Sequence, residues 1–282
     1  MEAIQTWLAV NGASGSNAEG SVAALTQALA AVNRPPARVI DIRTDDRPTR
    51  RALEAAGVGL LVLFTGDGSA NAIINDLEGW RGEALLLPGG TANLLACDLH
   101  GAEESEAIVA ALGQGRLACH PRHVVRCSQG AALIEVLAGP GAAWSDVREG
   151  LRDGDIGAVA GTTIEAAKQS TAGPMVHVVD PPLGHSEGYA GVRLSPVGDS
   201  MTVDGYGAKN VVDYVKQGIA LLRRDFREGP HDELGSHRKV VCTSSDGSPM
   251  ELMLDGERLT GLGQERFSLA PLGVKLLGLR HD

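Results

Sequence analysis

The chain has 282 residues, of which 43% are hydrophobic and 21% are charged. This length and balance suit one large domain or two of ordinary size, each with a true hydrophobic core. Aromatic residues make up 3% of the chain and the formal net charge is −10. Both values disfavour a nucleic-acid-binding protein, because such proteins stack bases on aromatic rings and neutralise phosphates with basic residues.

The apolar runs and the cysteines predict a cytoplasmic protein. The first residues, MEAIQTWLAV, lack the basic start of a signal peptide. The longest apolar run, 58–64, is far shorter than the roughly 20 residues of a membrane-spanning helix. The four cysteines form no Cys-x-x-Cys pair, and we interpret them as reduced, mostly buried thiols. Peripheral association with a membrane stays open.

Strand and helix patterns alternate over roughly the first hundred residues. Strands are expected at 4–10, 38–42, 58–64 and 84–87, and helices at 18–32, at 48–57, from about 69 and from about 93. Alternation of this kind predicts a parallel, doubly wound, Rossmann-like α/β domain. We place its end at residue 115.

Short strand patterns dominate from residue 116 onward. Strands are expected at 124–127, 131–137, 175–179, 240–244 and 250–254, and helices at 142–169 and 209–226. The turn Ser-Ser-Asp-Gly-Ser at 244–248 predicts a hairpin between the last two of these strands. A mainly β second domain is therefore expected over 116–271.

Two glycine-rich loops follow neighbouring predicted strands of the first domain. The candidate residues are Gly66, Asp67, Gly68 and Ser69 in the first loop, and Gly90, Thr91 and Asn93 in the second. Backbone N–H groups at the carboxyl ends of parallel strands bind phosphate, and glycine lets the backbone approach it closely. Asp67 is able to bind Mg²⁺, although a lone Gly-Asp-Gly is more often an ordinary turn.

Four motifs resemble one enzyme family in the family's own order. TGDGSANAIINDL at 65–77 is similar to the GGDGT signature of the diacylglycerol kinase and sphingosine kinase catalytic-domain family. LPGGTANLLACDL at 87–99 resembles that family's second motif, and VNGASGSN at 10–17 resembles its first loop. MLDGERL at 253–259 resembles its Asp-Gly-Glu segment.

The resemblance implies a nucleotide-binding domain over 1–115 and a β-sandwich-like lipid-substrate domain over 116–271, with a tail at about 272–282 that returns to the first domain. It implies that ATP is bound by Asn11, Ser14, Gly66, Gly68, Ser69, Gly90, Thr91 and Asn93. It also implies that Asp67 organises Mg²⁺ and that Glu257 is the general base. A carboxylate suits that role, since the acceptor hydroxyl loses a proton as its bond to phosphorus forms.

We therefore expect an ATP-dependent lipid kinase that phosphorylates a hydroxyl of a diacylglycerol-like or sphingoid-like lipid at a membrane surface. The sequence leaves the oligomeric state open, and a homodimer is compatible with it. Thr65, Ala72 and Leu94 depart from the family's motifs and favour a second hypothesis, a non-catalytic relative that binds nucleotide or lipid. An NAD kinase is a third, because it shares the glycine loop and the two-domain plan. The resemblance also raises a structural cation near Asp204.

An arginine-rich segment at 34–51 has two interpretations. It either faces anionic headgroups or forms a solvated face in which arginines alternate with aspartates.

Overall fold

The computed structural model describes residues 5–11, 19–90, 93–140, 173–207 and 231–280. The chain divides into two compact units, which we call the N-terminal unit (1–122 with 271–282) and the C-terminal unit (123–270). Each unit has its own hydrophobic core.

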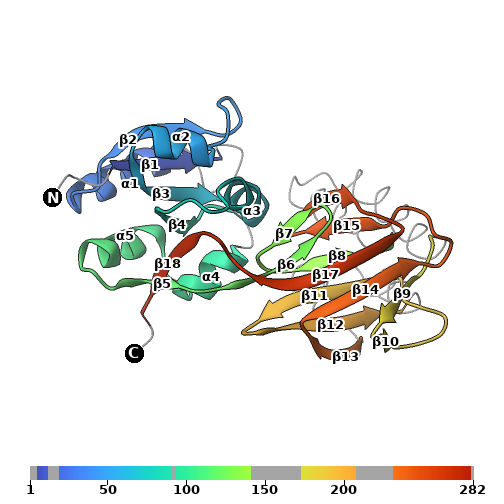
Figure 1. Ribbon diagram of the computed structural model, residues 1–282. Helices are drawn as coiled ribbons and strands as arrows, with labels where there is room; N and C mark the ends of the chain where they lie inside the picture. The colour runs from blue at the N-terminus through green and yellow to red at the C-terminus, as the bar shows by residue number, and fades with distance from the viewer. Residues whose placement is uncertain (1–4, 12–18, 91–92, 141–172, 208–230, 281–282) are drawn as a thin grey trace, which may run out of the picture. The chain divides into compact units, whose positions relative to one another are not determined.

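The N-terminal unit is built on a six-stranded sheet in the order β2-β1-β3-β4-β18-β5 (Figure 1). Its strands are β1 (Gln5–Val10), β2 (Pro36–Asp41), β3 (Val58–Thr65), β4 (Glu83–Pro88), β5 (Leu117–His120) and β18 (Lys275–Leu279). Its helices are α1 (Glu19–Ala31), α2 (Arg50–Ala55), α3 (Asp67–Asp76), α4 (Leu94–His100) and α5 (Ser105–Gly113). The strands from β2 to β18 are parallel and β5 is antiparallel to β18. The unit is thus a mixed α/β fold.

Strand β3 is apolar throughout because both of its faces are covered. Leu60, Val62 and Phe64 share a core with α1, which supplies Leu25, and with α5, which supplies Ile108. The intervening residues of β3 are also buried. A strand covered on both sides reads as one continuous apolar run, as the sequence does here.

The end of the chain completes the sheet of the N-terminal unit. Strand β18, red in Figure 1, pairs in parallel with β4 and antiparallel with β5. Since β5 lies at 117–120 and belongs to this sheet, the structure places the boundary between the units after Arg122 rather than after residue 115.

The C-terminal unit contains two six-stranded sheets around one core. The first sheet has the order β10-β9-β14-β17-β6-β7 and the second has the order β13-β12-β11-β8-β15-β16. The first contains β6 (His123–Cys127), β7 (Gly130–Ala132), β9 (Val176–Asp180), β10 (Pro182–Leu183), β14 (Lys239–Ser244) and β17 (Gln264–Pro271). The second contains β8 (Val136–Ala138), β11 (Gly191–Val197), β12 (Ser200–Tyr206), β13 (Asp232–His237), β15 (Glu251–Leu254) and β16 (Glu257–Thr260). Alternate residues of both sheets, such as Val240, Phe267, Leu194 and Val203, form the shared core.

The predicted hairpin at 244–248 is wrong. Strand β14 pairs with β9 and β17, whereas β15 pairs with β8 and β16 of the other sheet, so the turn carries the chain between sheets. Asp246 accepts hydrogen bonds from Ser248 N (2.9 Å) and Ser244 Oγ (2.8 Å). Hydrogen bonding by the side chain and the backbone of Ser248, and then by Ser244, lowers the pKa of Asp246 to about 2. A self-bonded Asp turn of this kind reverses the chain without requiring the flanking strands to pair.

Other expectations differ in smaller ways. The strand predicted at 131–137 is two short strands, β7 and β8. The helices predicted at 142–169 and 209–226 lie wholly outside the described residues. Among the helices that the structure describes, none is both long enough and apolar enough to cross a bilayer.

Candidate functional site

The candidate site lies where the strand order of the N-terminal sheet changes direction. The chain leaves β1 toward β2 on one side and leaves β3 toward β4 on the other, so right-handed crossovers place α1 and α3 on opposite faces. Ligands of open α/β sheets bind at the carboxyl ends of the strands at this point. Asn11 follows β1 and its Nδ2 donates to Ser69 Oγ in α3 at 3.2 Å. The predicted residues Asn11 and Ser69 are therefore brought together across the switch point.

The N-terminus of α3 has the properties of an anion site. Gly66 is the N-cap in an extended conformation and supplies no side-chain capping bond to this ten-residue helix. The first backbone N–H groups of a helix lack intrahelical partners and carry the positive end of the helix dipole. Asp67, Gly68 and Ser69 form this first turn. A phosphate group is a suitable partner for them.

The carboxylate of Asp67 points away from its own helix and caps the next one. Its Oδ2 accepts the N–H of Leu94 and its Oδ1 accepts the N–H of Leu95, each at 3.0 Å. These are the first two residues of α4. Both carboxylate oxygens thus satisfy backbone donors that would otherwise be available to an anion. The first two N–H groups of α4 are therefore occupied by Asp67, whereas the N-terminus of α3 has no side-chain cap.

The two glycine loops touch through their backbones. A Cβ on Gly90 would lie 2.5 Å from Gly66 Cα, and a Cβ on Gly89 would lie 2.6 Å from the backbone of Phe64 and of Thr65. The missing side chains of Gly89 and Gly90 are therefore required by loop packing.

Asn93 fixes the second loop from inside. Its Oδ1 accepts the N–H of Gly90 at 2.6 Å and its Nδ2 donates to Gly90 O at 2.8 Å. The residue has φ 51° and ψ 39°, a left-handed conformation that asparagine tolerates better than most residues. Its amide is thus engaged in holding the loop.

Ser14 and Thr91 lie outside the described residues. Glu257 belongs to the C-terminal unit, where it is exposed on β16.

The described residues do not build a magnesium site of their own. In the described parts of the chain, no group of three or more His, Cys, Asp or Glu side chains is placed to hold a metal ion. At the loops the carboxylate is that of Asp67, and both its oxygens accept N–H groups. Mg²⁺ usually keeps several waters and is held by one or two carboxylates together with substrate phosphates, so Asp67 by itself does not form a complete magnesium site made of protein ligands.

Asp204 carries its own counter-ion. Arg193 Nη2 and Nε donate to Asp204 Oδ2 at 2.8 and 3.2 Å, and His231 Nε2 lies 3.9 Å from Oδ1. Because the guanidinium already neutralises this nearly buried carboxylate, the pair leaves little attraction for a structural cation.

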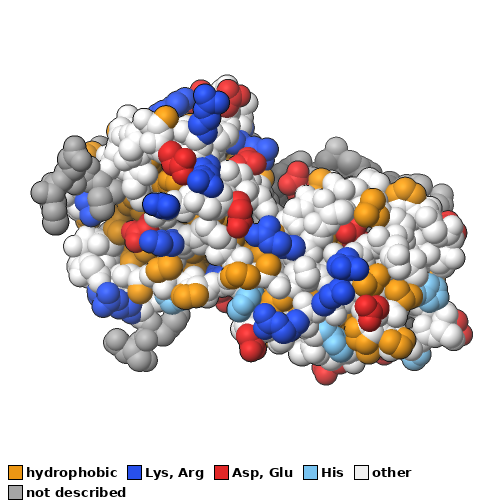
Figure 2. All heavy atoms as spheres, viewed as in Figure 1, with side chains coloured by type: hydrophobic (Ala, Val, Ile, Leu, Met, Phe, Trp, Pro, Cys, Tyr) orange, Lys and Arg blue, Asp and Glu red, His pale blue; other side chains and the backbone are white. Residues whose placement is uncertain are grey.

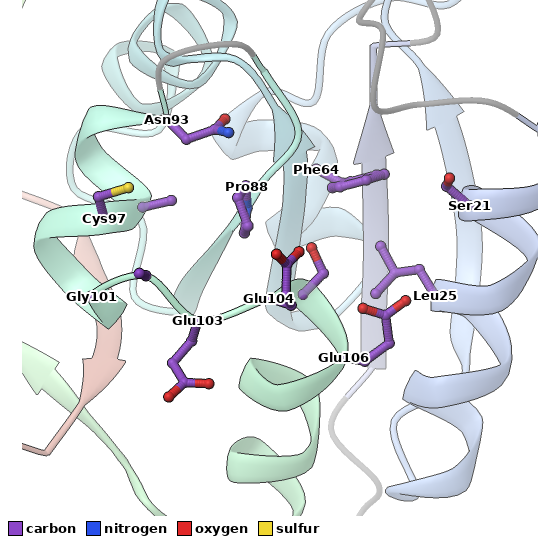
Figure 3. Close-up of a pocket in the computed structure, with 13 residues that line it drawn as sticks. Ser21, Leu25, Phe64, Pro88, Asn93, Cys97, Gly101, Glu103, Glu104 and Glu106 are labelled. Atoms are coloured by element: carbon purple, nitrogen blue, oxygen red, sulfur yellow. The ribbon is translucent and has the colours of Figure 1, made fainter.

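A cavity of about 400 Å³ lies on the face of the sheet covered by α1 and α5 (Figure 3). Leu25, Phe64 and Pro88 line it with apolar surface, and Glu104 and Glu106 add exposed carboxylates. These negative charges disfavour phosphate. The cavity is large enough for a small molecule, but its acidic lining makes it unsuitable for the anionic group expected at the N-terminus of α3.

The thiols are more exposed than predicted. Cys97 lines the cavity and is exposed, as is Cys119, whereas Cys127 is half-buried and Cys242 is buried. The expectation that the cysteines are mostly buried is wrong.

The arginine-rich segment alternates with acids. Arg43 pairs with Asp41 (2.7 Å), Arg47 with Asp76 (3.7 Å) and Arg50 with Glu54 (2.8 Å). Figure 2 shows blue and red side chains interspersed on this face of the N-terminal unit. The pairs support the interpretation as a solvated face.

Two anchoring carboxylates escaped sequence reasoning. Asp255 accepts N–H groups from Leu133 to Glu135, and Glu265 accepts from Ser128 and Leu262. The Asp-Gly pair at 255–256, which forms a left-handed turn, could have drawn attention to Asp255. No local sequence pattern marks Glu265.

Comparison with known proteins confirms the predicted resemblance. Residues 5–119 match the family model for the diacylglycerol kinase catalytic domain. Three solved structures are similar over 98% of this chain and 97% of theirs. They are a diacylglycerol kinase from Bacillus anthracis str. Sterne (TM-score 0.65, 15% identity) and two structures of putative diacylglycerol kinases from the same source (0.62 at 15% and 0.61 at 16%). At these identities the likeness concerns the fold. No curated protein matches the sequence.

Proposed function

We propose that this chain, whose residues 5–119 match the diacylglycerol kinase catalytic-domain family, transfers the γ-phosphoryl group of ATP to a hydroxyl of a diacylglycerol-like or sphingoid-like lipid. The observation that carries the proposal is the uncapped N-terminus of α3 at the switch point, tied to β1 by the bond between Asn11 and Ser69. This segment lies within the part of the chain that matches the family.

In this proposal the first turn of α3 binds phosphate oxygens through the backbone N–H groups of Asp67, Gly68 and Ser69. Positioned backbone donors stabilise the charge that spreads over the transferred group. Asp67 keeps the second loop in place by capping α4. Mg²⁺ would arrive with the nucleotide, since the loops offer no complete set of ligands for it.

Glu257 is the proposed general base. It would accept the proton of the acceptor hydroxyl as the oxygen bonds to the γ-phosphorus and the bond to the β-phosphate oxygen breaks. The support is its place in the Asp-Gly-Glu segment and its exposure on β16, where an acceptor is able to reach it. A positioned base typically contributes about 10²- to 10⁴-fold to the rate.

The test is an assay with labelled ATP against total lipid extract, with the product identified by mass spectrometry. The wild-type protein should phosphorylate a lipid, and Glu257→Gln should bind ATP normally while losing turnover by about 10²-fold or more. Thr260→Ala, on the exposed surface of the same strand, is the matched control and should keep its activity. Wild-type turnover by Glu257→Gln would rule out this base.

The non-catalytic relative is the second candidate. It is favoured by the engagement of both Asp67 oxygens with backbone N–H groups of α4. It predicts that ATP raises the melting temperature without any transfer of label to lipid. NAD belongs in the acceptor panel, because its phosphorylation would favour an NAD kinase instead.

A further inference from the structure

The side chain of Asp255 is a buried carboxylate with no role in the chemistry above. It begins the turn between β15 and β16 and is 7% exposed. Asp255 and Gly256 have φ values of 48° and 95°, so the turn is a tight left-handed one. An aspartate at this depth needs strong partners, because burial without hydrogen bonds would be costly.

Those partners come from a different part of the chain. Asp255 Oδ2 accepts the N–H of Leu133 at 2.7 Å, and Oδ1 accepts those of Ile134 and Glu135 at 3.0 and 2.8 Å. The backbone N–H of Asp255 donates in turn to Glu135 O at 3.1 Å. The turn is therefore anchored to the β7–β8 connection through both its side chain and its backbone.

Glu257 emerges from this anchored turn. Its cross-strand partner is Leu254, which is 2% exposed and belongs to the core of the unit. Core packing of Leu254 fixes the backbone before the turn, and the bonds of Asp255 fix the turn itself. The backbone from which the exposed Glu257 side chain extends is thus held by the anchored turn and by the cross-strand partner Leu254.

We infer that Asp255 is a positioning residue, which sets where the Glu257 carboxylate stands by clamping the β15–β16 turn onto residues 133–135. The inference rests on the proposed function, because it gives Glu257 the role of base. A displacement of about 1 Å in a reacting group costs roughly 10²-fold in rate, so loss of the clamp should reduce turnover while nucleotide binding is kept.

The variant to test is Asp255→Asn, which keeps the size of the side chain but turns an NH₂ group toward backbone donors. We expect kcat to fall about 10- to 100-fold with an unchanged KM for ATP. Glu265→Gln is the matched control. Glu265 is 1% exposed in the same unit and accepts bonds from Ser128 N, Ser128 Oγ and Leu262 N. It should lose stability without the same loss of kcat.

A double-variant cycle separates positioning from general damage. If Asp255 acts through Glu257, then Asp255→Asn combined with Glu257→Gln should be no slower than Glu257→Gln alone. A double variant slowed by the product of the two single effects would overturn the inference, as would equal kcat losses in Asp255→Asn and Glu265→Gln.

Failure of the proposed function would be seen separately. If the wild-type protein transfers no phosphate, or if Glu257→Gln is fully active, the proposed reaction or base is wrong. The clamp itself is then decided by amide hydrogen exchange. Faster exchange at 133–135 and 255–258 in Asp255→Asn would support it, and unchanged exchange there would overturn it.

Discussion

Replacing Asp67 by alanine should destabilise the N-terminal unit even when no metal is present. The carboxylate accepts the N–H groups of Leu94 and Leu95, and so connects the first turn of α3 to the first turn of α4. Alanine cannot accept either bond. The two donors lie beside half-buried and buried side chains, where water replaces the carboxylate only in part.

The magnitude follows from these two bonds. Loss of an N-cap typically costs about 0.5–2 kcal/mol, and a donor left without a partner adds about 1–3 kcal/mol when fully buried. Partial hydration reduces the second contribution, so we expect a loss of about 2–3 kcal/mol. Asp67→Asn keeps one acceptor oxygen and should lose about half as much. Such changes are large against a total stability of about 5–15 kcal/mol.

Urea unfolding in the presence of EDTA measures the effect. Trp7 and Trp80 are 7% and 3% exposed in the N-terminal unit, so their fluorescence reports on its unfolding. Asp76→Ala, at the other end of α3, is the control, because Asp76 makes an exposed contact of 3.7 Å with Arg47 and should matter by less than about 0.5 kcal/mol. If Asp67→Ala unfolds like the wild type in EDTA and changes only the Mg²⁺ dependence of ATP binding, the capping argument is refuted.

Gly90→Ala should destabilise the protein and weaken ATP binding, because the added Cβ would lie 2.5 Å from Gly66 Cα. Gly20→Ala in α1 should instead stabilise the protein by about 0.5–1 kcal/mol, because the space around Gly20 is open. Calorimetry and ATP titration would show whether the two variants differ in sign. Burial lowers the pKa of His100 to about 4, so the free energy of unfolding should decrease as pH falls from about 6.5 toward 4, by up to about 3 kcal/mol. His100→Gln should remove this slope in urea titrations at stepped pH, and an unchanged slope would exclude His100 as its source. Burial raises the pKa of Asp255 to about 7, against the three N–H bonds that lower it. The contribution of Asp255 to the free energy of unfolding is therefore fully present below about pH 4, and it is lost as the pH rises through 7. The difference in unfolding free energy between wild type and Asp255→Asn should change by up to about 4 kcal/mol between pH 4 and 8, and a constant difference would contradict the assignment.

The sequence predicts well where periodicity and burial agree. The apolar run at 58–64 and the helix after it appear as β3 and α3, because a strand covered on both faces has no polar alternation to mislead. Turn chemistry is less informative. Ser-Ser-Asp-Gly-Ser has the composition of a hairpin turn, yet Asp246 bonds to its own neighbours and the strands on either side belong to different sheets.

The candidate site shows the same division. Spacing alone indicated that two glycine loops meet at one edge of a sheet, and Gly66 and Gly90 do touch. The sequence does not indicate in which direction a side chain points. The hydrogen bonds from the N-terminus of α4 to the Asp67 carboxylate could therefore not be predicted. Contacts between distant segments, such as that of Asp255 with residues 133–135, are equally invisible to a local pattern.

Strand β18 also affects the order in which the two units fold during synthesis. Residues 275–279 pair with β4, so a ribosome has already released all of 123–270 when this strand appears. The C-terminal unit is continuous in sequence and is free to fold first. Until β18 is available, the edge of β4 that pairs with it stays unpaired. Chains that are truncated before residue 275 and released from the ribosome should therefore have a protease-resistant C-terminal unit and a protease-sensitive N-terminal unit. The N-terminal unit, although most of it is synthesised first, would then be the last to mature.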